Sequence, residues 1–301
     1  MKKSIYLSIF LSVSLNGQST NNKDLEKGTS IQRNTLFNLD EIKVRWKKAA
    51  LENCPGVLCV VSPPAPSFTC GTSTITDVDN NIYNTVLIGT QCWTKENLKV
   101  TKFNDGSTIL LDASGGSAGN VAGQTWSGQT TGAYTIYANE SSSGMNATNY
   151  GYLYNWYAAK GIITPGGSPT KNICPTGWHV PTDPEWNIMI QTLDPSQAVN
   201  SGNVLTFQGN QSTIAGGMLK STSNLWTATT GANNSSDFSA LPGGTRDNIG
   251  RFLYIFVNAL FWSSTEESLS NAWIRSLSLN SDLVRARINK SNGTSVRCLK
   301  D

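Results

Sequence analysis

The chain has 301 residues, and only 14% of them are charged, with 23 basic against 20 acidic side chains. It carries no basic tract, so we do not expect a nucleic-acid partner. Most of its polarity comes from Ser, Thr, Asn and Gly, which together with nine tryptophans is typical of a loop-rich extracellular β domain. The same mixture suits carbohydrate binding, although a buried position is the commoner role for any one tryptophan.

The first 17 residues form a pattern typical of a Sec signal peptide. Lys2 and Lys3 precede an apolar run over residues 5–15, and Gly17 is a small residue suited to the cleavage site. The apolar run is too short to span a membrane, and no later segment approaches the required length of about 20 apolar residues. We therefore expect residues 1–17 to be removed and the rest to be exported to the periplasm, the cell surface or the medium.

Residues 18–67 predict a separate N-terminal region. A polar lead-in is followed by a short amphipathic helix over residues 38–52, where apolar side chains recur every three or four positions. A proline-rich stretch over residues 62–67 then predicts a stiff, extended linker. The main domain is expected to begin near residue 68 and to occupy residues 68–301.

The main domain starts with a predicted hairpin. Ile75 and the segment Ile82–Ile88 flank a turn over Asp77–Asn81. The carboxylate spacing in this turn resembles a calcium loop, but the glycine and the closing glutamate of such a loop are missing. Further on, the stretch over residues 111–145 is rich in Gly, Ser and Thr, and it predicts a long exposed insertion.

Two helices and a series of strands follow. A short helix is predicted over Asn155–Lys160, with Gly161 placed to cap its end. Thr182 and Glu185 have the spacing of a capping box for a helix over residues 183–193. The pair Asn292-Gly293 predicts a hairpin turn between the last two strands. Strands are predicted over residues 252–256, 259–264, 272–279, 283–288 and 294–299.

Eight segments in chain order carry a family resemblance, and they span roughly residues 70–301. They are Thr76–Gly89, Gln91–Leu98, Tyr150–Ala159, Cys174–Trp186, Gly216–Ser221, Phe238–Gly244, Trp262–Glu266 and Ser295–Cys298. Their number and order resemble the Fibrobacter succinogenes major paralogous domain, a family of secreted bacterial modules. The resemblance implies an α+β fold similar to C-type lectins and formylglycine-generating enzymes. Such a fold has short twisted antiparallel strands, two main helices and long loops, and is tied by disulfides.

Six cysteines in an exported chain predict three disulfides, but their pairing cannot be chosen from the residues alone. The family resemblance favours two pairs and leaves a third. These are Cys174–Cys298, Cys70–Cys92 and Cys54–Cys59. Cys54 and Cys59 could instead bind a metal ion, but no second pair of ligands accompanies them, so we expect a disulfide.

Few residues offer catalytic chemistry. His179 is the single histidine, and we expect it to be structural and partly buried. The sequence of residues 115–119 matches the Gly-x-Ser-x-Gly motif of the nucleophile elbow in serine hydrolases. That motif needs a helix after it, but a glycine- and serine-rich loop follows here. The oxidase chemistry of formylglycine-generating enzymes needs a reactive cysteine pair, and no cysteine lies between Cys174 and Cys298. The sugar-binding signatures of calcium-dependent lectins, Glu-Pro-Asn and Trp-Asn-Asp, are also missing, so we expect no metal and no cofactor.

Two regions remain as candidate ligand-binding sites. The loop over Pro242–Gly250 brings Arg246, Asp247 and Asn248 together, which offer hydrogen-bond donors and acceptors. The alternative for this loop is a solvated turn with an internal Arg–Asp pair. Among the tryptophans, Trp226 is the candidate for an exposed ring, whereas Trp262 lies in an apolar strand that indicates the core.

These observations predict a secreted, non-catalytic binding module that recognises a glycan or another cell-surface polymer. One alternative is a structural or adhesive surface protein without a small ligand. The other is a hydrolase that uses carboxylates such as Asp105, Asp237 or Glu266.

Overall fold

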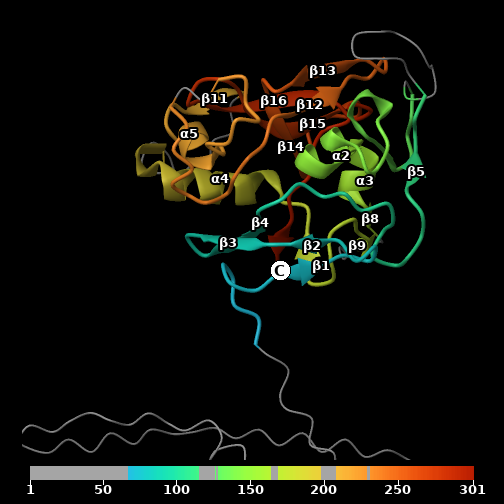
Figure 1. The fold of residues 1–301 in the computed structure, drawn as a ribbon, viewed down its shortest axis with the longest axis horizontal. Coiled ribbons are helices and arrows are strands. Elements are labelled where there is room, and N and C mark those ends of the chain that lie inside the picture. Colours follow the sequence, from blue (N-terminus) through green and yellow to red (C-terminus); the bar gives the residue numbers. More distant parts are fainter. Residues whose placement is uncertain (1–66, 115–125, 127, 164–168, 198–207, 229–230) are drawn as a thin grey trace, which may run out of the picture. The chain divides into compact units, whose positions relative to one another are not determined.

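The computed structural model describes residues 67–114, 126, 128–163, 169–197, 208–228 and 231–301. In this part of the chain the fold is mixed α+β, built mostly from sheets with short helices around them (Figure 1). The helices are α2 (Met145–Tyr150), α3 (Trp156–Lys160), α4 (Asp183–Leu193) and α5 (Ala215–Leu219), with 3-10 turns at Tyr137–Asn139 and Pro195–Gln197. The predicted signal peptide, lead-in helix, linker and Cys54–Cys59 pair lie outside the described residues, as do residues 115–119.

The largest sheet has six strands in the order β11-β16-β15-β14-β12-β13. All neighbours are antiparallel except β12 and β14, which are parallel. The predicted strands over residues 252–288 are confirmed with small shifts at their ends. Their bounds are β11 (Gly209–Ser212), β12 (Gly243–Arg246), β13 (Phe252–Ile255), β14 (Ala259–Glu266), β15 (Asn271–Leu277) and β16 (Leu283–Asn289).

A second sheet contains the end of the chain at its centre. Its order is β10 (Trp178–His179), β17 (Leu299–Lys300), β4 (Gln91–Thr94) and β3 (Thr85–Ile88), so the last strand pairs with β10 and β4. The predicted hairpin across Asn292-Gly293 is therefore wrong, because β17 does not pair with β16. Gly293 instead exchanges two backbone hydrogen bonds with Arg246, and a Cβ added there would lie 2.9 Å from the ring of Trp126. This glycine allows close packing between distant segments.

Three small sheets complete the fold. They are β1 (Ile75–Thr76) with β2 (Ile82–Tyr83), β5 (Leu110–Leu111) with β6 (Ala133–Thr135) and β7 (Leu153–Tyr154), and β8 (Ile162–Ile163) with β9 (Pro169–Lys171). The predicted hairpin at Asp77–Asn81 is confirmed, because Ile75 pairs with Tyr83 across it. The predicted exposed insertion over residues 111–145 is wrong for Trp126 and residues 133–137, which are buried, whereas Leu111, Met145 and residues 141–143 are exposed.

The two main helices begin and end where local sequence signals place them. The Asn155 side chain accepts a hydrogen bond from the backbone of Ala158 at the start of α3, and Gly161 ends that helix with φ +69°. At α4 both halves of the capping box form between Thr182 and Glu185. Trp186, on the buried face of α4, packs 4.8 Å from the ring of Trp93. The apolar face of α4 thus holds it against the core.

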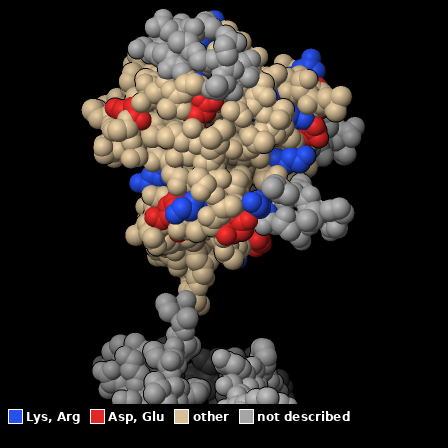
Figure 2. All heavy atoms as spheres, turned by 90° about the vertical axis from the view of Figure 1, so that its right-hand side faces the viewer, with Lys and Arg blue, Asp and Glu red and all other residues tan. Residues whose placement is uncertain are grey.

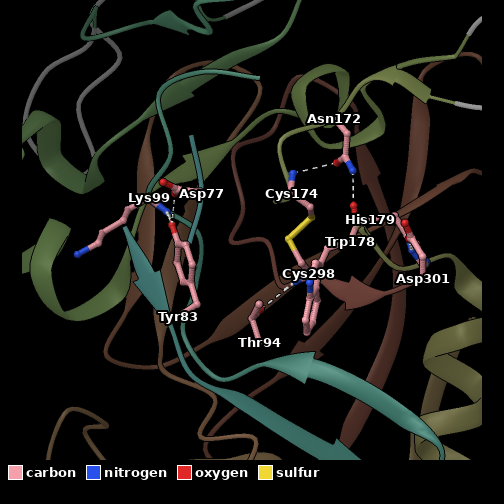
Figure 3. Close-up of a disulfide and its surroundings, with 10 residues drawn as sticks. All are labelled: Asp77, Tyr83, Thr94, Lys99, Asn172, Cys174, Trp178, His179, Cys298 and Asp301. Atoms are coloured by element: carbon pink, nitrogen blue, oxygen red, sulfur yellow. Dashed lines mark hydrogen bonds and ion pairs between the residues drawn. A yellow bond between two sulfur atoms is a disulfide. The ribbon is translucent and has the colours of Figure 1, made fainter. Parts of the chain in front are cut away.

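Two of the predicted disulfides are confirmed, Cys174–Cys298 and Cys70–Cys92. The first is buried in the larger core cluster and joins the segment before β10 to the segment before β17 (Figure 3). Asn172 accepts a hydrogen bond from the Cys174 backbone at 2.9 Å, and the Thr94 hydroxyl accepts one from the Cys298 backbone at 2.9 Å. The long-range link that the family resemblance implied is therefore present.

Candidate functional site

The hairpin of β12 and β13 contains the loop that the sequence singled out. Gly244 has φ +67°, and a Cβ at this position would lie 2.5 Å from the Leu253 carbonyl and 2.7 Å from the Ile255 nitrogen. Only glycine allows the two strands to approach so closely here. The close pairing of the hairpin thus explains Gly244.

The tip of the hairpin is organised by Asp247. Its Oδ1 accepts hydrogen bonds from the backbone nitrogens of Ile249 and Arg251, and its Oδ2 accepts one from Arg251 Nε at 2.6 Å. The alternative expected from the sequence was an Arg–Asp pair inside the loop. Asp247 does form such a pair, but with Arg251, just past the loop, and not with Arg246. The buried carboxylate of Asp247 holds the turn, which leaves Asn248 exposed at its tip.

Arg246 does not face solvent, so the expectation that it offers donors to a ligand is wrong. Its side chain has no exposed surface. The guanidinium donates to the backbone carbonyls of Asp112 and Ser114, and it stacks 4.4 Å from the centre of the Trp126 ring. Burial lowers the pKa of Arg246, an effect that the nearby Asp112 carboxylate opposes. Arg246 fastens the hairpin to a segment more than 130 residues earlier.

Trp226 is not an exposed ring, contrary to the sequence prediction. It is 4% exposed and belongs to the second core cluster. Its indole nitrogen donates to the Ala240 carbonyl at 3.1 Å, and the ammonium of Lys220 lies 5.4 Å from the ring centre. The polar neighbours in sequence suggested exposure, but the indole packs inward. Trp262 is fully buried, as predicted.

Among the described residues, the most exposed aromatic side chains are Tyr254 and Phe256, at 56% and 46%, followed by Phe68 at 38%. Both have positive φ, at +65° and +66°. For bulky residues this conformation is uncommon and costs of order 1–3 kcal/mol each. Between them, Ile255 packs against the small cluster of Tyr137, Leu153 and Phe252. The backbone therefore anchors Ile255 and turns the two neighbouring rings toward solvent.

Sequence reasoning missed these two rings because Phe252–Phe256 reads as a uniformly apolar strand. Strand alternation gives no local signal for them, because Phe252 would share a face with Tyr254 and is nevertheless buried. The exposed residues are Tyr254 and, just past the strand, Phe256.

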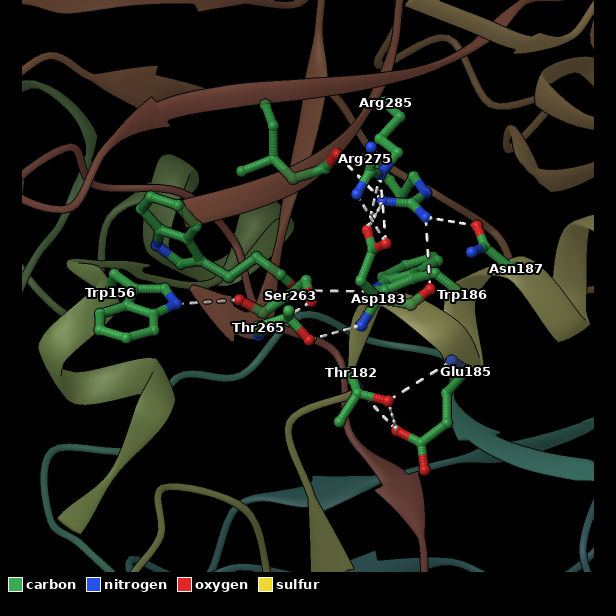
Figure 4. Close-up of polar contacts among 12 residues, drawn as sticks. Trp156, Thr182, Asp183, Glu185, Trp186, Asn187, Ser263, Thr265, Arg275 and Arg285 are labelled. Carbon is green, nitrogen blue, oxygen red and sulfur yellow. Dashed lines mark hydrogen bonds and ion pairs between the residues drawn. The ribbon is translucent and has the colours of Figure 1, made fainter. Parts of the chain in front are cut away.

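A cluster of buried charges lies elsewhere, under α4 (Figure 4). Asp183 accepts hydrogen bonds from Arg275 Nη1 at 2.6 Å and from Arg285 Nε at 3.0 Å, while Asn187 accepts one from Arg275 Nη2 at 2.7 Å. The guanidinium of Arg285 also lies 3.3 Å from the centre of the Trp273 ring. This cluster couples the first turn of α4 to β15 and β16, which is a structural role.

The three carboxylates considered for hydrolysis are each paired with a lysine. Asp105 lies 3.3 Å from the ammonium of Lys171, Asp237 lies 2.6 Å from that of Lys95, and Glu266 bonds to Lys290. A hydrogen bond from Ser107 lowers the pKa of Asp105, and one from Lys290 lowers that of Glu266. A general acid needs a raised pKa, so these two groups are unsuited to that role.

His179 is partly buried, as the sequence predicted, and it lies between two carboxylates. Its Nε2 is 2.9 Å from Glu185 and its Nδ1 is 2.6 Å from Asp301. The hydrogen bond to Glu185, with a smaller contribution from Asp301, raises the pKa of His179 above its usual value near 6.5. The imidazole joins the end of β17 to the start of α4, so we assign it a structural role.

The described residues contain no group of three or more His, Cys, Asp or Glu side chains placed to hold a metal ion. Nor does any helix among them have the length and apolarity needed to cross a membrane. Figure 2 shows one face of the molecule, where acidic and basic side chains are interspersed among mostly uncharged residues. The surface therefore offers no single-sign patch on this face.

Together these features define a disulfide-tied α+β domain with two exposed aromatic side chains on its β12–β13 hairpin. The chain belongs to the Fibrobacter succinogenes major domain family, whose sequence profile matches residues 86–300. Comparisons with curated proteins and with solved structures find no match.

Proposed function

We propose that this protein is an exported, non-catalytic binding module that recognises a glycan or another surface polymer through its β12–β13 hairpin. The observation that carries the proposal is the exposure of Tyr254 and Phe256 in strained backbone conformations. Strain of this kind persists where the surrounding structure enforces it, and it clusters at ligand-binding positions. Aromatic faces also stack well on the flat C–H faces of sugar rings.

The surroundings of the two rings supply the polar part of such a site. Asn248 is exposed at the tip of the hairpin, and the Arg251 side chain is partly exposed beside Asp247. Amide and guanidinium groups can orient sugar hydroxyls by hydrogen bonds. On the other side, Phe256 makes an edge contact with Tyr150, with the ring centres 6.0 Å apart. This contact supports one of the two rings in place, so less conformational entropy is lost on binding.

Export and a lectin-like fold belong to the same proposal. Disulfides persist in oxidising compartments, so Cys174–Cys298 and Cys70–Cys92 favour a location outside the cytoplasm. The buried link between the segment before β10 and the last strand supports a C-type-lectin-like arrangement. In that arrangement a rigid, disulfide-tied scaffold presents binding loops.

The test is retention of the mature protein on a panel of insoluble polysaccharides. Tyr254 and Phe256 are replaced together by Asn, which tolerates positive φ better than aromatic residues do. Because both side chains are half exposed, we expect the double variant to keep its melting temperature and to lose retention. A matched control is Leu269→Ala, which removes a highly exposed apolar side chain away from the hairpin and should leave retention unchanged.

Two outcomes would overturn the proposal. If the wild type is retained on no polysaccharide, the structural or adhesive alternative takes precedence. If the double variant is retained as well as the wild type, the hairpin is not the binding site. A large loss of stability in the double variant would instead show that the two rings are part of the core.

A further inference from the structure

A cavity of about 230 Å³ opens between the turn after β1 and the segment that leads to β10. One wall comes from Thr76, Asp77 and Val78, and the opposite wall comes from residues 173–176, with Asn104 between them. The β1–β2 hairpin and β13 lie at opposite ends of the described domain (Figure 1). The cavity is therefore separate from the aromatic hairpin, and an inference about it does not depend on the function proposed above.

The one acidic side chain in the lining is Asp77, and its carboxylate already accepts hydrogen bonds from within the protein. Asp77 Oδ1 accepts hydrogen bonds from the backbone nitrogens of Asp79 and Asn81, both at 2.9 Å. Its Oδ2 accepts one from the Asn81 side chain at 2.9 Å. The same oxygen accepts a second from the Tyr83 hydroxyl at 2.7 Å, which Figure 3 shows. Each carboxylate oxygen thus uses its two lone pairs, so Asp77 has none left for a metal ion or an ammonium group.

An anion is also a poor match for the cavity. Its lining contains no lysine, arginine or histidine, and the one charged lining residue is the Asp77 carboxylate. Just outside the lining, Asp105 and Lys171 form an ion pair at 3.3 Å, so their charges offset one another. A negative ligand would meet repulsion without a compensating cation. The charge of Asp77 thus disfavours an anion, and its occupied lone pairs leave a cation no direct hydrogen bond to it, so a neutral ligand fits the cavity best.

The polar groups that remain can bind hydroxyls. Among the described residues, no side-chain hydrogen bond engages the hydroxyls of Thr76 and Thr176. The Oδ1 of Asn104 accepts a bond from the Asn172 backbone at 3.0 Å, which leaves its Nδ2 as a donor. Two hydroxyls, which donate or accept, and one amide donor suit a ligand with several hydroxyl groups of its own.

The rest of the lining is apolar. Val78, which is 41% exposed, is the apolar side chain that a ligand can reach, whereas Ile173 and Pro175 also line the cavity but are buried. A pyranose ring combines a flat C–H face with hydroxyls around its edge, and the volume of the cavity is enough for one such ring. We infer that this cavity binds a single neutral pyranose unit, with its C–H face on Val78 and its hydroxyls on Thr76, Thr176 and Asn104.

The inference is tested by mapping amide chemical shifts of the mature protein with its disulfides intact. Methyl glucoside, methyl galactoside and xylose serve as neutral probes, and sodium glucuronate and glucosamine serve as charged probes of similar size. Because the site has no aromatic ring, we expect millimolar affinity. The expected result is saturable shifts at residues 76–78, 104 and 173–176 with at least one neutral probe, and markedly weaker shifts with both charged probes.

Two variants separate the cavity from general effects. Thr76→Val keeps the side-chain shape and removes the hydroxyl, so affinity for the neutral probe should fall about fivefold, the value of one net hydrogen bond. Thr72→Val makes the same change at an exposed position outside the cavity, and affinity should stay constant. The inference is overturned if no neutral probe shifts the cavity residues, if the charged probes bind as well, or if Thr76→Val binds like the wild type. Shifts confined to residues 248–256 would also overturn it, while leaving the hairpin proposal intact.

Discussion

Removal of the Cys174–Cys298 disulfide should destabilise the protein more than removal of Cys70–Cys92. The two pairs span 124 and 22 residues, and loop-closure entropy gives about 5 and about 3.4 kcal/mol for these separations. Cys174 and Cys298 are also fully buried in the larger core cluster, where the hydroxyls of serine replacements would lack partners. The expected difference between the two double-serine variants is therefore about 1.5 kcal/mol or more.

The assay is urea unfolding of the two double variants, Cys174→Ser with Cys298→Ser and Cys70→Ser with Cys92→Ser, without reductant. The free energy of unfolding and its dependence on urea concentration are compared with those of the wild type. The variant without the long-range disulfide should have the lower free energy. If it is as stable as the wild type, or more stable than the other variant, the reasoning from loop length and burial is refuted.

Three further predictions concern charged groups. Asp183→Asn should lower the free energy of unfolding in urea by about 3–5 kcal/mol, because Arg275 and Arg285 would lose the carboxylate that neutralises them. As a control, Asp237→Asn removes the carboxylate of an exposed ion pair and should change stability little. Since the pKa of His179 is raised in the folded state, its contribution to stability should be complete below about pH 6.5 and should fall as the pH rises through the higher folded pKa. A His179→Gln variant that keeps the same pH dependence would contradict this assignment. Addition of a chelator should leave the melting temperature unchanged, because the oxygens of Asp77 are occupied by hydrogen bonds; a drop restored by calcium would show the opposite.

Helices α3 and α4 and strands β14 to β16 could be predicted from the sequence, because interactions between nearby residues determine where they form. The capping box of Thr182 and Glu185 fixed the start of α4, and Gly161 fixed the end of α3. The strands β14 to β16 were also recognisable from their apolar residues, and each pairs with its neighbour in sequence. In these cases the residues that decide the structure lie within a few positions of one another or in adjacent strands.

Where distant segments decide the structure, the sequence was misleading. Asn292-Gly293 looks like a hairpin turn, yet the chain passes beside Arg246 and continues to a different sheet. Arg246 looks like a ligand-binding residue, yet its partners are carbonyls of residues 112 and 114. No spacing within either segment carries this information, because the contacts join parts of the chain that are separated by about 45 or 130 residues in sequence.

The binding site shows the same limit. Trp226 has polar neighbours in sequence, but the fold places it against Ala240 and Lys220 in the core. The exposed rings, Tyr254 and Phe256, come from a segment that reads as a buried strand. Their orientation follows from the positive φ values that the closely paired hairpin imposes, and an apolar sequence does not reveal these.

The most direct test of the proposed function is to locate a bound saccharide on the protein. Oligosaccharides prepared from whichever polysaccharide retains the wild type are titrated into the isotopically labelled protein, and amide and aromatic chemical shifts are followed. We predict that the largest changes fall on the rings of Tyr254 and Phe256 and on the amides of residues 248–256. Changes that avoid this hairpin, or the absence of any retaining polysaccharide, would contradict the account.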